Sequence, residues 1–159
     1  MTKATIVQLA DDVVEQLNKK QGGWAVSFQA ERKYQPKYEF ENVGTMQVQA
    51  CPMTWNFTLD NRSAAYGWKN EYVIGLGFFY RPKPNAGDQP IERFDGCMML
   101  VEQVTDFWKD LLRTNVLLSN CSITGIDLGG ATGAPYHHEV IETQNQFTSV
   151  IQITFQKYR

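Results

Sequence analysis

Histidine and cysteine are scarce in this sequence of 159 residues, which has two histidines and three cysteines. The histidines, His137 and His138, are adjacent, and no two cysteines form a C-x-x-C pair. A serine or cysteine nucleophile needs a nearby base, and a zinc site needs several nitrogen or sulfur ligands. The scarcity of histidine and cysteine excludes several common catalytic mechanisms and zinc sites. We therefore expect no enzyme activity, no catalytic residue, no cofactor and no metal ion.

Long hydrophobic runs are also missing. Residues 1–14 mix apolar and polar side chains and lack the unbroken apolar segment of a signal peptide. The longest apolar stretch, residues 72–80, is interrupted by Gly75 and Gly77 and is far shorter than the roughly 18–20 residues that span a bilayer. We therefore expect no export and no membrane partner, and the odd number of cysteines fits buried thiols in a reducing compartment.

Neither sign of charge is in clear excess, because 15 Lys and Arg stand against 17 Asp and Glu, a formal net charge of -2. Coating nucleic acid requires many uncompensated cations that displace counterions. The composition argues against a general nucleic-acid coat and leaves a local basic patch open. We expect weak binding to free DNA.

Three short segments match site motifs only in part. Gly75-Leu76-Gly77 lacks the third glycine of a dinucleotide fingerprint, and the glycine-rich segment 129–133 lacks the Lys-Ser/Thr pair of a phosphate loop. The segment His137-His138-Glu139 has metal-ligand residue types, but adjacent side chains of an extended chain point to opposite sides. We expect a mobile glycine loop and a solvated histidine segment instead of a nucleotide or metal site.

Apolar residues recur every three or four positions in two segments, which predicts two amphipathic helices. The first covers residues 4–20 and ends before Gly22-Gly23, and the second covers residues 91–115. Asp11 and Asp12 are adjacent in the first helix and do not face each other. We expect both carboxylates to be solvated.

Alternating apolar and polar residues predict the strands of a sheet. The predicted strands cover residues 24–30, 46–59, 65–80, 122–127 and 147–156. Pro52 cannot donate a ladder hydrogen bond and marks a bend, a bulge or an edge, whereas the strand over 65–80 is apolar on both faces and is expected to be central. The element order predicts an α+β fold: one domain over 1–159 with a mostly antiparallel, mixed sheet and two helices on one face.

Aromatic residues make up 13% of the chain, and large rings suit cores and subunit contacts. Those that fall on periodic apolar faces are expected in the core: Phe28, Trp55, Phe57, Phe94, Trp108 and Phe155. Those that fall in predicted loops are expected to meet neighbouring subunits: Tyr34, Tyr38, Phe40 and Tyr136.

Several segments carry a resemblance that covers most of the chain: the helix over 7–14, residues 30–39, the strand ending near Cys51-Pro52, the helix over 99–107 and the closing strand over 146–155. Together they resemble the small tail-completion proteins of tailed bacteriophages, of the tail terminator or head-tail joining type. The resemblance implies a structural virion protein of the tail and neck, present in the host cytoplasm during assembly. It implies a homo-oligomeric ring of six subunits that caps the head-proximal end of the tail tube and joins the tail to the neck.

The implied partners are the tail tube protein and a neck, stopper or connector protein, with genomic DNA only passing through the lumen. A head-tail stopper, an adaptor or a minor capsid protein stays open within this class. From another class, a small-ligand-binding domain or an enzyme using the loop over 129–138 stays open. The candidate contact residues are loop residues: Tyr34, Pro36, Tyr38, Phe40, Arg81, Lys83, Ile91, Tyr136 and His137.

Overall fold

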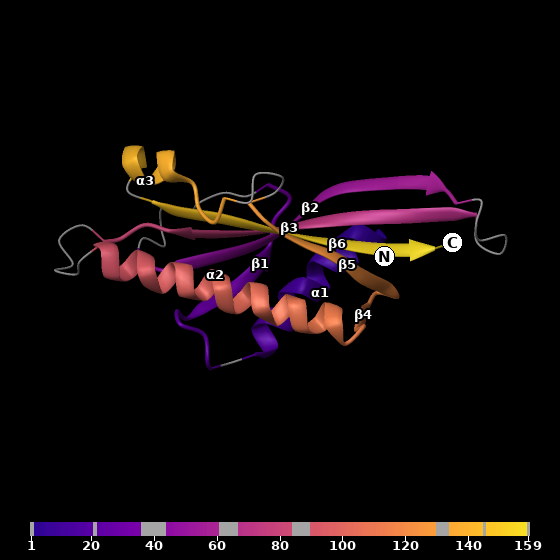
Figure 1. Cartoon of the computed structure of the whole chain (residues 1–159), viewed down its shortest axis with the longest axis horizontal. Coiled ribbons are helices and arrows are strands. Elements are labelled where there is room, and N and C mark those ends of the chain that lie inside the picture. The colour runs from indigo at the N-terminus through magenta and orange to yellow at the C-terminus, as the bar shows by residue number, and fades with distance from the viewer. Residues whose placement is uncertain are drawn as a thin grey trace.

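The computed structural model describes residues 2–20, 22–35, 44–60, 67–83, 90–129, 134–144 and 146–158. In this part of the chain, a six-stranded sheet and three helices confirm the predicted α+β class (Figure 1). The elements follow in the order α1 (Thr5–Lys19), β1 (Phe28–Arg32), β2 (Met46–Leu59), β3 (Trp68–Tyr80), α2 (Pro90–Arg113), β4 (Leu117–Leu118), β5 (Cys121–Leu128), α3 (His138–Gln144) and β6 (Phe147–Tyr158).

The sheet has the strand order β1-β2-β3-β6-β5-β4. β1 runs parallel to β2, and the other neighbouring strands are antiparallel, so the sheet is mixed as expected. β3 pairs with β6 over residues 69–80 and with β2 over residues 68–79, and residues 74–80 are buried. The prediction of a central strand covered on both sides is thus confirmed for that part of β3.

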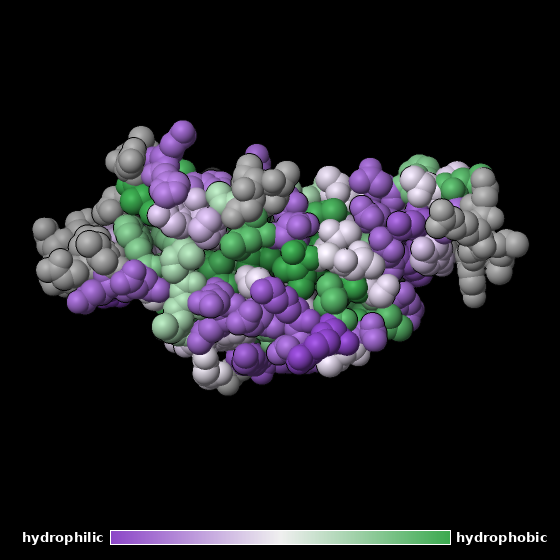
Figure 2. All heavy atoms as spheres, viewed as in Figure 1, coloured by the Kyte–Doolittle hydropathy of each residue, from purple (hydrophilic) through white to green (hydrophobic). Residues whose placement is uncertain are grey.

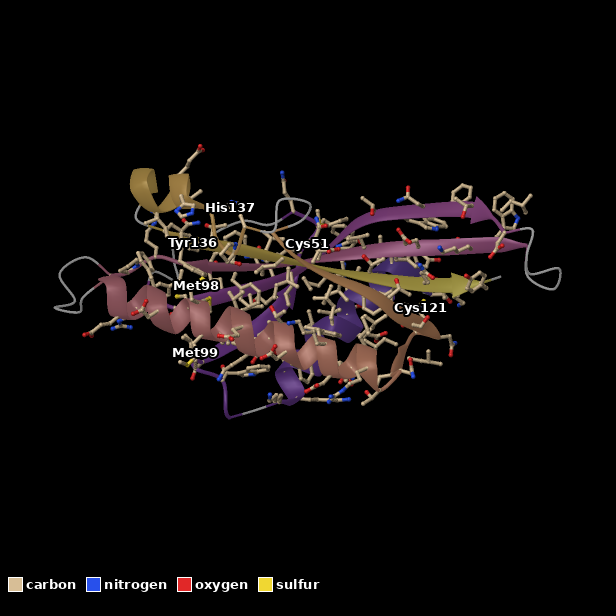
Figure 3. All side chains as sticks on the ribbon, in the orientation of Figure 1. Cys51, Met98, Met99, Cys121, Tyr136 and His137 are labelled. Atoms are coloured by element: carbon tan, nitrogen blue, oxygen red, sulfur yellow. The ribbon has the colours of Figure 1, made fainter. Side chains whose placement is uncertain are left out.

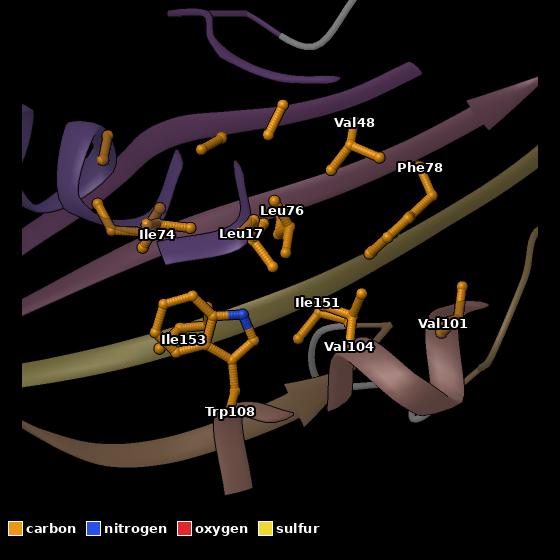
Figure 4. Packing of buried hydrophobic residues seen from close by; sticks show 14 of the residues in the cluster. Leu17, Val48, Ile74, Leu76, Phe78, Val101, Val104, Trp108, Ile151 and Ile153 are labelled. Carbon is orange, nitrogen blue, oxygen red and sulfur yellow. The ribbon is translucent and has the colours of Figure 1, made fainter. Parts of the chain in front are cut away.

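Both long helices pack on one face of the sheet, as predicted. α1 contacts β1, β2 and β3, while α2 contacts β5 and β6. The buried residues of β3 at alternate positions from 72 to 80 belong to the same apolar cluster as the buried residues of both helices. Figure 4 shows Leu17 of α1 and Val104 and Trp108 of α2 directed toward β3 and β6. The core therefore lies between this face and the two helices.

Pro52 marks a bulge within one continuous strand. The register between β2 and β3 shifts between Pro52 and Thr54, where one extra residue of β2 has no partner. A bulge accommodates the missing N–H donor and leaves the ladder intact on either side. Of the three alternatives that the sequence leaves open at this proline, the structure has two: a bulge after Pro52, and an open strand edge at Pro52, because β1 pairs with β2 only up to Ala50.

The first strand begins later than predicted, at Phe28 instead of Trp24. Residues 24–27 alternate in polarity, but the Trp24 ring packs against Phe28 and against Phe107 of α2, with ring centroids 5.8 and 5.9 Å apart. The short elements α3 and β4 were not predicted, because neither has enough apolar positions to show a period. None of the helices within the described ranges combines the length and apolar character needed to cross a bilayer.

The expectation that Asp11 and Asp12 are solvated is wrong. A carboxylate oxygen of Asp11 lies 2.7 Å from Nε of Arg32 in β1, and its other oxygen lies 2.6 Å from Nζ of Lys3. Asp12 accepts a hydrogen bond from the hydroxyl of Ser119, next to β5. The two carboxylates therefore bond α1 to β1, at one end of the strand order, and to the segment between β4 and β5, at the other end.

Candidate interaction surface

The end of the sheet formed by the tips of β2 and β3 extends past both long helices (Figure 1). A strand of 14 residues such as β2 spans about 46 Å, whereas the 15 residues of α1 span about 22 Å. A helix of that length cannot cover the whole strand. The core-facing side of the sheet therefore continues beyond the helices without a cover in the described part of the chain.

Cross-strand pairing decides which side chains share this uncovered side, because paired residues of neighbouring strands point the same way. Three rows of paired residues extend the core face toward the tips: Trp55, Tyr72 and Phe155; then Phe57, Asn70 and Lys157; then Leu59 and Trp68. Tyr72 and Phe155 are buried core residues. We use the name aromatic face for the exposed members Trp55, Phe57, Leu59 and Trp68.

All four side chains of the aromatic face are large, apolar and about half exposed. Their exposed fractions are 49% for Trp55, 60% for Phe57, 58% for Leu59 and 47% for Trp68. The assignment of Trp55 and Phe57 to the core was wrong. The alternation of the sequence identified the correct face of the strand, but alternation does not say whether another element covers that face.

Ring contacts hold the aromatic face in place. Trp55 stacks on buried Tyr72 with centroids 5.8 Å apart and meets Phe57 at 6.1 Å. Phe57 in turn lies edge-on to Trp68 at 5.7 Å. Such pairs restrict the rings before any partner binds. The surface is thus a preformed apolar patch, anchored to the core through Tyr72.

A cavity of about 280 Å³ opens between the three aromatic rings and Asn70. Asn70 is only 3% exposed. Its Oδ1 accepts a hydrogen bond of 3.1 Å from Nε1 of Trp55, while its Nδ2 has no hydrogen-bond partner among the described residues. An unpaired buried donor costs free energy, so this amide is a local cost beneath the aromatic face.

β2 also has an open edge beside the aromatic face. β1 pairs with β2 only from Met46 to Ala50, and no described strand pairs with that edge beyond Ala50. Unpaired backbone groups on an exposed strand are a template for association with another chain. The aromatic side chains and the open edge therefore occur on the same segment of β2.

The predicted contact residues lie elsewhere. Tyr34 is 72% exposed, with its ring 5.3 Å from the Arg32 guanidinium. Arg81, Lys83, Tyr136 and His137 belong to the opposite end of the sheet, where Tyr80 pairs with Phe147. Figure 3 shows Tyr136 and His137 near α3, far from the tips of β2 and β3.

Several contacts tie this second group to its own chain. Arg81 donates to Oε1 of Gln146 at 3.3 Å, and the Tyr136 ring stacks on Phe147 at 6.2 Å and lies 4.4 Å from His138. His137 is exposed, and its backbone N–H donates to Thr148 over 2.9 Å. Ile91 is in the first turn of α2, and nothing is described of its side chain; Pro36, Tyr38 and Phe40 lie outside the described residues.

The described residues contain no group of three or more His, Cys, Asp or Glu side chains that could hold a metal ion. All three cysteines are buried thiols, as predicted. Burial raises the pKa of the Cys97 thiol to about 12, against the opposing charge of Arg93. No family model matches this chain, and no curated protein matches it.

Proposed function

We propose that this protein is a structural component of a tailed-bacteriophage virion, of the tail terminator type, that assembles into a homo-oligomeric ring. The ring, expected to have six subunits, caps the head-proximal end of the tail tube and meets a neck or connector protein on its other side. The chain performs no catalysis in this role and needs no cofactor. Genomic DNA passes through the lumen without tight binding, which a net charge of -2 allows.

The observation that carries the proposal is the aromatic face. Four large apolar side chains side by side on one strand pair are costly to expose, and such patches mark protein contacts in soluble proteins. A patch that meets a different surface of the next copy produces a ring when the rotation closes. The resemblance of the chain to tail-completion proteins and this patch support the same assembly.

Mass measurement and negative-stain imaging of the purified protein test the proposal. We expect ring-shaped oligomers for the wild type and mainly monomers for Phe57→Glu, because the substitution places a charge in the centre of the aromatic face. Thr58→Glu is the matched control, since it adds the same charge to the same strand on the opposite side of the sheet. A wild type that stays monomeric and does not associate with tail tubes contradicts the proposal.

A further inference from the structure

A second apolar surface lies along α2, beside β5. It is a groove of about 490 Å³ whose apolar part is formed by Met98, Met99, Val101 and Leu128. Met99 is 56% exposed, so the groove is open to solvent. Figure 2 shows hydrophobic atoms gathered along one side of α2 and bordered by the hydrophilic atoms of the helix. We call this surface the α2 groove.

The border of the α2 groove is acidic. Asp95, Glu102 and Asp106 line it, together with Lys109, whose Nζ lies 3.7 Å from Asp106. In the described ranges, neither Asp95 nor Glu102 has an ion-pair partner. The groove thus presents apolar side chains beside two uncompensated carboxylates.

The aromatic face has the complementary character. Lys157 pairs with Asn70 in register and so lies on the same side of the sheet as Phe57. Within the ranges that the structure describes, Lys157 has no ion-pair partner, and no acidic residue belongs to the three rows that form this side of the tips. An apolar patch with one free cation matches an apolar groove with two free anions.

The two surfaces cannot meet within one molecule. Met98 and Met99 lie on α2 toward one end of the long axis, and the tips of β2 and β3 form the other end (Figure 3). The two surfaces also differ in their residues, so their contact between copies is head-to-tail. A head-to-tail contact forms a closed ring or an open filament, which agrees with the proposed function.

We propose that the aromatic face of one copy docks in the α2 groove of the next copy, with Lys157 beside Asp95 and Glu102. This inference rests on the proposed function and names the contact that builds the ring. A volume of about 490 Å³ lies within the range of roughly 300–1,000 Å³ that accepts ligands of several rings, and therefore suits the Phe57 and Trp68 side chains.

Two variants that each damage one surface test the contact. Phe57→Glu places a carboxylate on the aromatic face, and Met99→Glu places one in the groove. Both side chains are more than half exposed, so the fold should tolerate the changes. Thr58→Glu and Leu117→Glu are the controls, because Leu117 is also an exposed apolar residue but does not line the groove. Circular dichroism and thermal unfolding establish that each variant folds.

We expect each of the two variants to weaken self-association by about thirtyfold or more, as for a central contact residue, and the controls to assemble normally. Mixing the two variants should produce one-to-one dimers, measured by analytical ultracentrifugation. The intact aromatic face of Met99→Glu meets the intact groove of Phe57→Glu, and the two damaged surfaces repel each other.

Four other outcomes overturn the inference. Rings of Met99→Glu like those of the wild type show that the aromatic face docks elsewhere, and the proposed function then stands. Two monomeric variants that do not combine show that each surface meets some other part of the neighbouring copy, and the proposed ring then stands. If the wild type binds tail tubes through Phe57 but does not self-associate, the aromatic face is a contact with the tube. A wild type that neither assembles nor binds tubes removes both the inference and the proposed function.

Discussion

Nε1 of Trp55 donates a hydrogen bond of 3.1 Å to Oδ1 of Asn70, and this bond joins an exposed ring to a buried amide. Asn70 is 3% exposed, and its other polar atom, Nδ2, has no described partner. The pair lies where the core of the sheet ends and the aromatic face begins. The hydrogen bond orients the Trp55 ring, while Nδ2 of Asn70 stays buried without a partner among the described residues, which costs free energy.

Trp55→Phe should lower the free energy of unfolding by about 1–2 kcal/mol, because Oδ1 of Asn70 then loses its only donor among the described residues while it stays buried. In the background of Asn70→Val, which has no polar atoms to satisfy, the same change should cost less than about 0.5 kcal/mol. Urea unfolding of the four proteins of this cycle measures the difference. Equal costs in the two backgrounds would show that the hydrogen bond is without effect.

Tyr72→Phe should raise the free energy of unfolding by about 1 kcal/mol. The Tyr72 side chain is 1% exposed, and its hydroxyl has no hydrogen-bond partner among the described residues. Removing an unpaired buried hydroxyl relieves its desolvation cost, while the stacking on Trp55 remains. Tyr158→Phe, at a side chain that is exposed, is the control and should change little. A clear loss of stability in Tyr72→Phe would reveal a hidden partner of the hydroxyl.

Asp11 makes stability depend on pH on the acid side. Burial by itself raises the pKa of this carboxyl, but the hydrogen bonds and charges of Lys3 and Arg32 outweigh burial and lower it. A lowered pKa in the folded state stabilises the fold above the unfolded value of about 3.9, and the contribution is lost as pH falls through the folded pKa.

Asp11→Asn should therefore cost about 1 kcal/mol at neutral pH and almost nothing near pH 2, where the wild-type carboxyl is protonated too. Unfolding in urea at the two pH values measures this. Glu15→Gln is the matched control on the same helix, because its pair with Lys19 is more exposed on both sides and should contribute little at either pH. A constant cost of Asp11→Asn across the range speaks against the assigned ion pairs.

The cysteines should resist thiol reagents in the folded protein. Cys51, Cys97 and Cys121 are buried, and burial raises the pKa of Cys51 and raises that of Cys97 to about 12. Only the thiolate reacts, so a colorimetric thiol assay near pH 8 should detect no native cysteine and all three after denaturation. Rapid native labelling of any one cysteine contradicts the burial.

The raised pKa of the Cys97 thiol also affects stability at alkaline pH. The stability that this thiol contributes is complete below its unfolded pKa near 9.0 and is lost as pH rises toward the folded pKa of about 12.

Periodicity sufficed for the main elements because their own side chains carry the signal. Each signal is contained in a short stretch of sequence. Examples are the apolar positions of α1 and α2, the alternation of β2, β3 and β6, and the missing N–H of Pro52. Trp24 shows where this fails, since residues 24–27 alternate in polarity but the ring packs against Phe107 of a distant helix. The ion pair of Asp11 with Arg32 is likewise a contact between separate elements.

The sequence by itself determined which residues can form helices and strands and which side of each strand is apolar. Only the tertiary structure decided which part of that apolar side is covered. Trp55 and Phe57 alternate just as the core residues Ile74 and Leu76 do, yet they lie half exposed beyond α1 and α2. The physical reason is that a strand advances more than twice as far per residue as a helix, so two helices leave the ends of long strands uncovered.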